Sequence, residues 1–497
     1  MTVIESRPLA PQAKVRKHYI ENWDSEDVTA WEAGGKQIAK RNLIWSVVAE
    51  HVGFSVWSIW SVMVLFMPVS VYGIDAAGKF FLVAVPTLVG SLLRLPYTVA
   101  TARFGGRNWT IFSALVLFVP TVLTLYFMAH PGTSYTAFMV VAAFAGIGGG
   151  NFASSMTNIN AFYPQRLKGW ALGLNAGGGN IGVPAIQLIG LLVIATAGNR
   201  SPQMVCAVYL VLIACAAVGA ALFMDNLGNQ TVQVRSLFEV MKFHDSWTMS
   251  FLYVGTFGSF IGFSFAFAQV LQIDFLAGLT AGGTVKATAA MQASAALHAA
   301  QIAFLGPLLG SLARPLGGML ADKIGGGKIT LYTFIAMIAS AGILVAAGTF
   351  DDQTPGAPSG GVLVAFIVGF MLLFVLSGIG NGSTYKMIAA LFSARSRSLV
   401  DAGGTEHEAA AWSRTMSGAL IGIAGSIGGL GGVGINLVLR ASYNSPAKSA
   451  TMAFWVFLGF YAVCAALTWA VYLRRPQRVT STKRIASASV TGPGHDD

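Results

Sequence analysis

Two arginines each interrupt a long apolar stretch of this sequence. Arg94 lies in GSLLRLPYT, within the apolar run 80–101, and Arg314 lies in GPLLGSLARPLGG. A charge near the middle of a bilayer costs at least ~2.5–3.5 kcal/mol, so each arginine needs a compensating role. The planar guanidinium group binds oxyanions through paired hydrogen bonds. The two residues therefore predict an anion-binding site within a membrane.

The sequence around each arginine is repeated. RLPYTVATARFGGRNWT begins at Arg94 and RPLGGMLADKIGGGKIT begins at Arg314; in both, a cation follows nine residues later and a Gly-Gly pair eleven residues later. Parallel repeats of this kind are typical of transporters whose substrate site lies between two halves near the bilayer midplane. We therefore expect the two arginines at equivalent depths, one on each half, facing the same ligand.

Either arginine could instead pair with a carboxylate and serve only the structure. Of the twenty Asp and Glu residues, only Glu50 lies well inside an apolar stretch, while Asp274 and Asp322 lie at the ends of such stretches. Asp322 belongs to the short loop after the apolar stretch 297–320, where we expect it to latch neighbouring helices. The scarcity of counter-ions favours a bound anion, and the presence of only two guanidinium groups suits a small monovalent one. Nitrate and nitrite fit, although formate and bicarbonate share this chemistry.

An acid–histidine pair, Glu50 and His51, lies in the first apolar stretch, SVVAEHVGFSVW. A carboxyl group buried there favours its neutral form unless it is paired, because desolvation penalises the charge, and histidine titrates near neutrality. Adjacent helical residues project roughly 100° apart, so only one of the two need face a transport pathway. We expect Glu50 to couple transport to protons, with His51 as the reserve candidate. Alternatively, Glu50 reaches the cytoplasmic edge or bonds a neighbouring helix.

The elements that must position these residues are membrane-spanning helices. The chain of 497 residues is 55% hydrophobic and only 10% charged, whereas soluble domains carry about 25% charged residues. Apolar stretches of about 20 residues are long enough to span a bilayer. Twelve such spans are predicted: 43–67, 80–101, 109–129, 135–158, 170–196, 203–223, 247–271, 297–320, 329–349, 361–390, 415–438 and 450–473. This predicts an all-α polytopic membrane protein with two pseudo-symmetric halves of six helices.

The distribution of charge sets the expected orientation. Of 31 Lys and Arg residues, 23 fall in the N-terminal segment, the even-numbered loops and the C-terminal tail. By the positive-inside rule both termini are cytoplasmic, so the net charge of +11 indicates topology and not nucleic-acid binding. Residues 1–42 are expected to form a cytoplasmic segment without a cleavable signal peptide. The two halves are 43–223 and 247–473, joined by a cytoplasmic linker at 224–246. The second half contains an external insertion at 273–296 and is followed by a basic cytoplasmic tail, 474–497.

Glycine-rich segments occupy spans four, five, ten and eleven, as in AGIGGGNFASSMTNINAFYP and GALIGIAGSIGGLGGVG. Small residues at intervals of three and four let helices approach closely and slide. We expect six of them to serve gating: Gly177, Gly178, Gly179, Gly425, Gly428 and Gly429. The GGGK segment lacks the spacing of a nucleotide-binding loop. No metal cluster, cofactor motif or nucleophile–base set is evident in the sequence, so neither an enzyme nor a bound metal or cofactor is expected.

Several motifs together resemble one family. GSLLRLPYT, GGGNFASSMTNI, ALGLNAGGGNIG, LYVGTFGSFIGFS and GPLLGSLARPLGG are similar to segments of the nitrate/nitrite porters, the NarK-type branch of the major facilitator superfamily, over about residues 41–472. The resemblance implies the major facilitator fold and a nitrate site at Arg94, Arg314, Asn175, Asn180, Tyr253, Phe257 and Phe152. Tyr253 and Phe257 are four residues apart and so share one helix face. Hydrogen bonds between helices, or ordinary core packing, are the alternative roles for the non-arginine residues.

The resemblance leaves the coupling mode open. The Glu50–His51 pair resembles the proton-symporter branch of the family, whereas its nitrate/nitrite exchangers lack such a pair. Symport of nitrate with protons is the first expectation, nitrate/nitrite antiport the alternative, and a nitrate sensor without transport a second alternative. Expected partners are nitrate, nitrite, protons and the lipid bilayer, for a monomer in the inner membrane that serves nitrate respiration or assimilation. The long Ala/Gly-rich connection 273–296 has no functional interpretation.

Overall fold

The computed structural model describes residues 15–228, 234–354 and 356–474 and is nearly all helical. Within these ranges, eleven helices are long and apolar enough to cross a membrane. A twelfth crossing is formed by two helical segments, Val28–Trp57 and Ile59–Phe66, which are bent by 45° relative to each other. The all-α fold with twelve membrane-spanning helices predicted from the sequence is therefore confirmed.

The first half contains the crossings one to six. Its elements are α1 (Val28–Ala30), η1 (Trp31–Gly35), α2 (Lys36–Trp57), α3 (Ile59–Met63), η2 (Val64–Phe66), α4 (Val69–Tyr72), α5 (Ala76–Phe104), α6 (Gly106–Val116), α7 (Phe118–Met128), α8 (Tyr135–Ala145), η3 (Gly146–Gly150), α9 (Asn151–Phe162), α10 (Gln165–Asn180), α11 (Gly182–Ala197), η4 (Gly198–Arg200) and α12 (Gln203–Phe223). Several crossings combine consecutive elements, such as α8, η3 and α9.

The second half repeats this plan with longer helices. Its elements are α13 (Val234–Val240), α14 (His244–Tyr253), η5 (Val254–Gly258), α15 (Ser259–Leu279), α16 (Ala289–Ala303), α17 (Leu305–Ile324), α18 (Gly326–Gln353), α19 (Gly360–Asp401), α20 (Glu406–Tyr443), α21 (Thr451–Thr468) and η6 (Trp469–Leu473). A capping box starts α20, because Thr405 and Glu408 bond each other's backbone N–H groups.

The sequence repeat is also a structural repeat at two turns. The helix α5 ends at Gly105 with φ 86°, and α17 ends at Gly325 with φ 100°. Both angles lie in the left-handed region, which glycine enters without a steric penalty. The Gly-Gly pair of each arginine block therefore ends the arginine-bearing helix and starts the next one.

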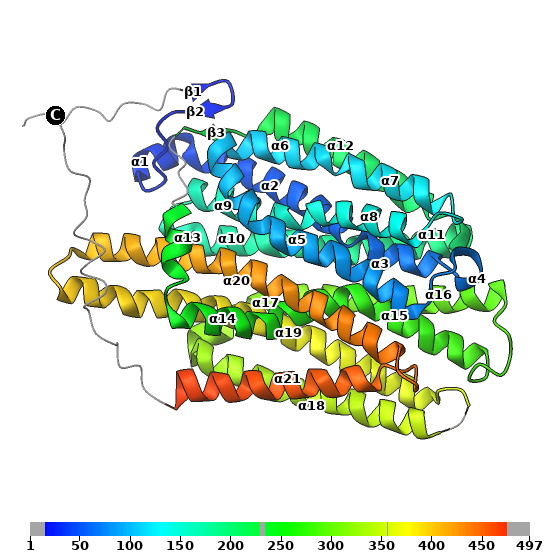
Figure 1. Ribbon diagram of the computed structural model, residues 1–497. Coiled ribbons are helices and arrows are strands. Elements are labelled where there is room, and N and C mark those ends of the chain that lie inside the picture. The colour runs from blue at the N-terminus through cyan, green and yellow to red at the C-terminus, as the bar shows by residue number, and fades with distance from the viewer. Residues whose placement is uncertain (1–14, 229–233, 355, 475–497) are drawn as a thin grey trace, which may run out of the picture.

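Figure 1 shows the first half, blue through cyan to green, lying beside the second half, green through yellow to red, with the helices running along a common direction. A small sheet lies at one end of the bundle, where β1 (Val15–Arg16) pairs antiparallel with β2 (Tyr19–Ile20), and β2 pairs parallel with β3 (Asn226–Leu227). Next to β3, Asp225 accepts hydrogen bonds from Arg41 (2.7 Å) and Asn42 (2.9 Å). The sheet and these hydrogen bonds join the segment before the first crossing, and the start of α2, to the segment after the sixth crossing.

The stretch predicted as an external insertion, 273–296, contains parts of two helices. Residues 273–296 are largely helical, because α15 continues to Leu279 and α16 begins at Ala289. Only residues 280–288 form a non-helical connection. Alanine is the strongest helix former, so an alanine-rich stretch extends the neighbouring helices. Of the predicted basic tail 474–497, all but Arg474 lies outside the described residues, as do residues 1–14 of the predicted N-terminal segment.

Candidate functional site

Arg94 lies in the middle of the bundle on α5 and is 1% exposed. Its guanidinium carbon is 4.8 Å from the ring centres of both Phe152 and Phe257 and 5.5 Å from that of Trp57. Its Nη1 donates to the carbonyl oxygen of Gly425 at 2.8 Å, across the boundary between the halves. Among the described residues, Nε and Nη2 have no hydrogen-bond partner. These two atoms form the side edge of the guanidinium group, which can donate two parallel hydrogen bonds.

Arg314 lies on α17 of the other half and is 8% exposed. Its guanidinium carbon is 4.8 Å from the ring centre of Tyr385. Its Nη1 and Nη2 atoms have no partner within the described residues, so the end edge of this guanidinium group is free. The charges of the two arginines lie within electrostatic reach of each other and of Glu50. Each half thus presents one unpaired, two-donor edge to a buried region.

Aromatic rings surround the two arginines. Tyr253 stacks on Phe257 with ring centres 5.1 Å apart, and on Tyr385 also at 5.1 Å. Tyr253 and Phe257 are fully buried, and the Tyr253 hydroxyl has no hydrogen-bond partner among the described residues. Phe152 is 4% exposed and packs against the Arg94 guanidinium group. The structure therefore brings three of the predicted residues into one cluster with the arginines.

Glu50 is fully buried on α2, close to this cluster. Its Oε2 accepts a hydrogen bond of 2.6 Å from Asn175 Nδ2, and the same amide nitrogen lies 2.6 Å from Ser155 Oγ. The other carboxyl oxygen, Oε1, has no partner in the described part of the chain. No ion pair joins Glu50 to a described cation within 4 Å. Asn175 therefore contacts the predicted proton-coupling residue directly.

A small polar cavity of about 10 Å³ adjoins Glu50. A space of this size is at the lower limit for one water molecule, which also needs polar partners. The cavity supplies them, because hydroxyl and amide groups dominate its lining: Ser46, Thr110, Ser113, Asn151, Ser154 and Ser155. The carboxyl group thus borders a site with room for water on the side of the first half.

Two other predicted residues lie differently. His51 Nδ1 is 3.2 Å from the carbonyl oxygen of Gly178, so its ring packs against the backbone of α10. Asn180 is 1% exposed at the end of α10, and both atoms of its amide group lack a hydrogen-bond partner among the described residues. Glu50 thus lies within electrostatic reach of both arginines, whereas His51 bonds the backbone of α10.

Comparison with known proteins places the chain in a family. Residues 51–432 match the Major Facilitator Superfamily. The chain is 35% identical to the "Nitrate/nitrite transporter NarU" of Escherichia coli (strain K12) over 478 residues, which cover 93% of this chain and 98% of that protein. This chain belongs to the NarK-type nitrate/nitrite porter family of the major facilitator superfamily. The resemblance inferred from the sequence motifs is confirmed.

Other relatives agree with this family. The "Probable nitrate/nitrite antiporter NarK2" of Thermus thermophilus is 29% identical over 92% of this chain and 97% of its own length. Among solved structures, the nucleoside transporter NupG superposes with a TM-score of 0.58 at 12% identity, covering 87% of this chain and 100% of NupG. At that identity the likeness concerns the fold alone. The major facilitator family consists of transporters, and this porter is a multi-pass membrane protein.

The predicted gating glycines of α20 occur where helices nearly touch. A Cβ atom on Gly428 would lie 2.5 Å from the Tyr253 ring, and one on Gly429 would lie 2.2 Å from Ser91 Oγ of α5. A Cβ atom on Gly425 would lie 3.3 Å from Arg94 Nη1. The contact between α5 and α20, which joins the halves beside the arginines, therefore depends on small residues.

The predicted glycines of α10 differ among themselves. A Cβ atom on Gly179 would lie 2.1 Å from Glu50 Oε1, and one on Gly178 would lie 2.4 Å from Val47, whereas Gly177 has no neighbour within 4 Å of that position. Gly179 thus provides the space that the Glu50 side chain occupies. Gly177 has no such packing role, and its predicted gating role stays untested.

The predicted latch residue, Asp322, forms an ion pair with Lys386 at 2.9 Å. The pair connects α17 with α19, and both side chains are about half exposed. Exposed ion pairs contribute about 0–1 kcal/mol. Asp322 therefore has a partner on a neighbouring helix of its own half, and its role as a latch stays a prediction.

Tyr385 and Ser155 also lie at the site, and neither was predicted from the sequence. A signal for Tyr385 exists, because GIGGG at 146–150 and GIGNG at 378–382 mark matching places in the two halves. Phe152 follows the first motif by two residues and Tyr385 follows the second by three. Ser155 carries no comparable signal. In the described part of the chain, no group of three or more His, Cys, Asp or Glu side chains is placed to hold a metal ion.

Proposed function

We propose that this protein carries nitrate across the cytoplasmic membrane by alternating access, with the anion held between Arg94 and Arg314. One observation carries the proposal. Each arginine is buried, comes from a different half, and presents a free two-donor edge while no described carboxylate pairs with it. Buried charges without partners are costly, and a bound monovalent anion offsets that cost when the two donor edges share it. A planar oxyanion matches the geometry of both edges.

The other predicted residues take supporting roles in this proposal. The Tyr253 hydroxyl and the Asn180 amide are buried groups that can donate to nitrate oxygens without adding charge. Phe152 and Phe257 form the apolar walls against Arg94. The glycines of α20 let the halves move against each other at close contact, and the glycines of α10 let α10 pack closely on α2. The name of the E. coli relative supports nitrate, with nitrite as a second substrate.

Proton symport through Glu50 is the coupling mode that we propose. Glu50 is a buried carboxyl group with one free oxygen, it borders a cavity with room for water, and it lies within electrostatic reach of both arginines. A nitrate ion that enters the cell moves against the membrane potential at a cost of ~2.3 kcal/mol per 100 mV. One accompanying proton makes entry electroneutral and a second makes it favourable. Asn175 holds the carboxyl group in place through its 2.6 Å hydrogen bond.

Exchange of nitrate for nitrite is the second candidate. It is favoured by the name of the T. thermophilus relative, an antiporter. Exchange moves one monovalent anion in each direction and requires no titrating group. In either mode we place the protein in the inner membrane as a monomer, with both termini in the cytoplasm and no role for nucleic acid.

The deciding experiment is nitrate uptake into proteoliposomes with an imposed pH gradient and no internal nitrite. Symport predicts accumulation of nitrate that a protonophore abolishes. Uptake that requires nitrite inside the vesicles, and ignores the pH gradient, would instead establish exchange. The absence of nitrate transport under both conditions would contradict the proposal as a whole.

A further inference from the structure

A second cavity, of about 360 Å³, lies between the halves at the end of the bundle opposite the small sheet, and its lining is mostly apolar with a few polar side chains. We call it the Lys79 cavity. The first half lines it with residues that include Leu65 and Lys79, and the second half contributes Gln269, Gln272 and Gln292. Its rim includes the exposed Gly282 and Gly283 of the connection between α15 and α16. The cavity therefore leads from an exposed rim to buried polar groups.

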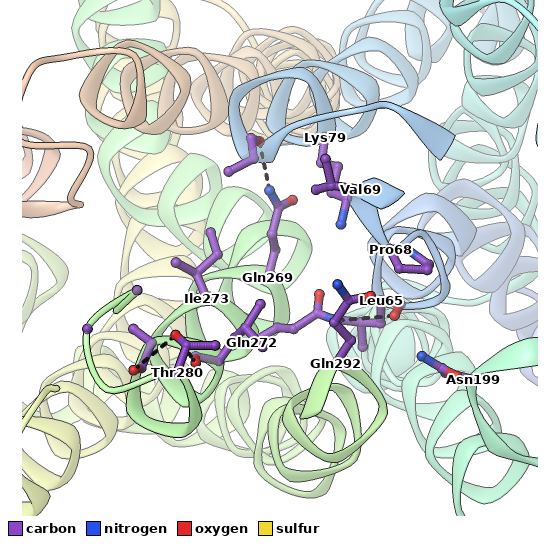
Figure 2. Close-up of a pocket in the computed structure, with 15 residues that line it drawn as sticks. Leu65, Pro68, Val69, Lys79, Asn199, Gln269, Gln272, Ile273, Thr280 and Gln292 are labelled. Atoms are coloured by element: carbon purple, nitrogen blue, oxygen red, sulfur yellow. Dashed lines mark hydrogen bonds between the residues drawn. The ribbon is translucent and has the colours of Figure 1, made fainter. Parts of the chain in front are cut away.

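Lys79 is the one charged residue in the lining, and it is 7% exposed. Its Nζ forms no hydrogen bond or ion pair with a described residue. The nearby Asp75 exerts an electrostatic influence on Lys79, but its carboxylate caps α5 by accepting the Gly78 N–H at 2.8 Å. Figure 2 shows Lys79 on the wall opposite Gln272 and Gln292. A buried ammonium group without a partner, facing a cavity, is suited to an anion.

Amide groups complete the donor set of this cavity. The side chains of Gln292 and Asn199 line it and have no hydrogen-bond partner among the described residues. Gln272 and Gln269 instead bond the first half, with Nε2 donating to the carbonyl oxygens of Leu65 (3.2 Å) and Ala76 (2.8 Å). The free donors are thus one ammonium and two amide groups, and none of the lining residues is acidic.

A closed layer separates this cavity from the two arginines. Gln187 Nε2 of the first half donates to the carbonyl oxygen of Ser264 in the second half at 2.7 Å. The Trp57 and Phe265 rings, again from different halves, lie 5.3 Å apart. Trp57 also contacts Arg94, so this layer lies directly beside the central site. An anion in the Lys79 cavity could reach Arg94 and Arg314 only after the halves separate at this layer.

We propose that the Lys79 cavity is an outer binding site for small monovalent oxyanions, which gather there before the halves open toward Arg94 and Arg314. The inference depends on the proposed nitrate transport and on the orientation with cytoplasmic termini, which places this cavity on the outer face. A single buried cation raises the local anion concentration and the rate of entry. Its loss therefore weakens nitrate capture from the outer face and leaves capture from the inner face intact.

The test compares the wild type with Lys79→Gln in membrane vesicles of both orientations, with initial nitrate transport measured against nitrate concentration. In right-side-out vesicles, Lys79→Gln is expected to raise the half-saturating concentration roughly three- to tenfold with a similar maximal rate. In inside-out vesicles, the half-saturating concentration of Lys79→Gln is expected to equal that of the wild type. The matched control is Lys286→Gln, an exposed lysine on the nearby connection that does not line the cavity. Equal effects of both substitutions would indicate general surface charge and overturn the proposal.

A second test restores a positive charge at position 79 by chemical modification of a single variant. The variant Lys79→Cys is treated with a methanethiosulfonate reagent that adds an ethylammonium group, or with one that adds an ethylsulfonate group. The cationic product is expected to recover the wild-type half-saturation and the anionic product to worsen it. Identical values for the two products would overturn the outer site. If the wild type transports nitrate and Lys79→Gln has no effect, only this inference is contradicted. If the wild type does not transport nitrate, the proposed function is contradicted.

Discussion

Arg94 and Arg314 hold equivalent places in the sequence repeat, yet their surroundings differ. Arg94 lies among three rings and is tied to the other half through Gly425, which leaves its side edge free. Arg314 lies on Tyr385 alone and keeps its end edge free. The repeat therefore supplies two matching charges, while the local packing determines which pair of donors each arginine presents.

The residues beyond the arginines differ even more between the halves. The first half adds a carboxyl group, Glu50, with its Asn175 partner and a polar cavity. The second half adds stacked tyrosines, Tyr253 and Tyr385, and no carboxyl group in the cluster described above. Under the proposed function, the halves therefore share anion binding, whereas proton coupling is assigned to the first half.

The largest expected effect comes from replacing either arginine. Arg94→Lys and Arg314→Lys keep the charge but lose the planar two-donor edge, at a cost of about 3 kcal/mol for two charge-assisted hydrogen bonds. We expect nitrate transport in proteoliposomes to fall by at least about a hundredfold in each variant. The control is Arg103→Lys, which replaces an exposed arginine on α5, the helix of Arg94. If Arg94→Lys and Arg314→Lys both transport nitrate like the wild type, the arginines do not form the nitrate site.

A more selective effect is expected from Glu50→Gln. Glutamine can still accept the hydrogen bond from Asn175, so the variant mimics a permanently protonated carboxyl group. We expect pH-driven accumulation of nitrate to disappear, while nitrate-for-nitrate exchange partly survives because it needs no net proton movement. The measurement is nitrate uptake under a pH gradient and under counterflow conditions.

The control for this variant is Glu239→Gln, which removes a carboxylate from a local ion pair with Arg235 on α13. It is expected to behave as the wild type. If Glu50→Gln still concentrates nitrate when only a pH gradient drives it, Glu50 is structural, and the proton must use His51 or water. The division of tasks between the halves would then be wrong.

The smallest expected effect concerns the neutral donors. Tyr253→Phe and Asn180→Ala each remove a buried polar group and are expected to weaken nitrate binding by roughly 1–3 kcal/mol. Half-saturating concentrations for nitrate and nitrite, measured in parallel, would show whether selectivity also shifts. Tyr332→Phe, a tyrosine that is 57% exposed on α18, is the matched control. Unchanged affinity and selectivity in both test variants would assign these residues to helix packing.

Part of this molecule could be predicted from sequence because the signals are local. The apolar spans follow from composition, and the arginine pair follows from a repeat of identical spacing. The bond between Glu50 and Asn175 joins residues 125 positions apart. Its existence depends on how α2 packs against α10, which Gly179 permits by leaving room for the carboxyl group. No short sequence motif predicts such a contact.

Residues 273–296 were predicted as an external insertion, and their secondary structure was not predicted. Alanine favours helix whenever the neighbouring turns are already formed. The structure extends both flanking helices into this stretch, to Leu279 and from Ala289. The cavity lined by Lys79 depends on these extensions, since Ile273, Leu276 and Gln292 of its lining lie within them.

The central claim is that nitrate binds between Arg94 and Arg314. Its most direct test is calorimetric titration of nitrate into the purified protein in detergent, in the absence of any gradient, for the wild type and for both lysine variants. The account predicts a saturable signal in the wild type that corresponds to one site and is lost in Arg94→Lys and in Arg314→Lys. Saturable binding of unchanged affinity in both variants would contradict it.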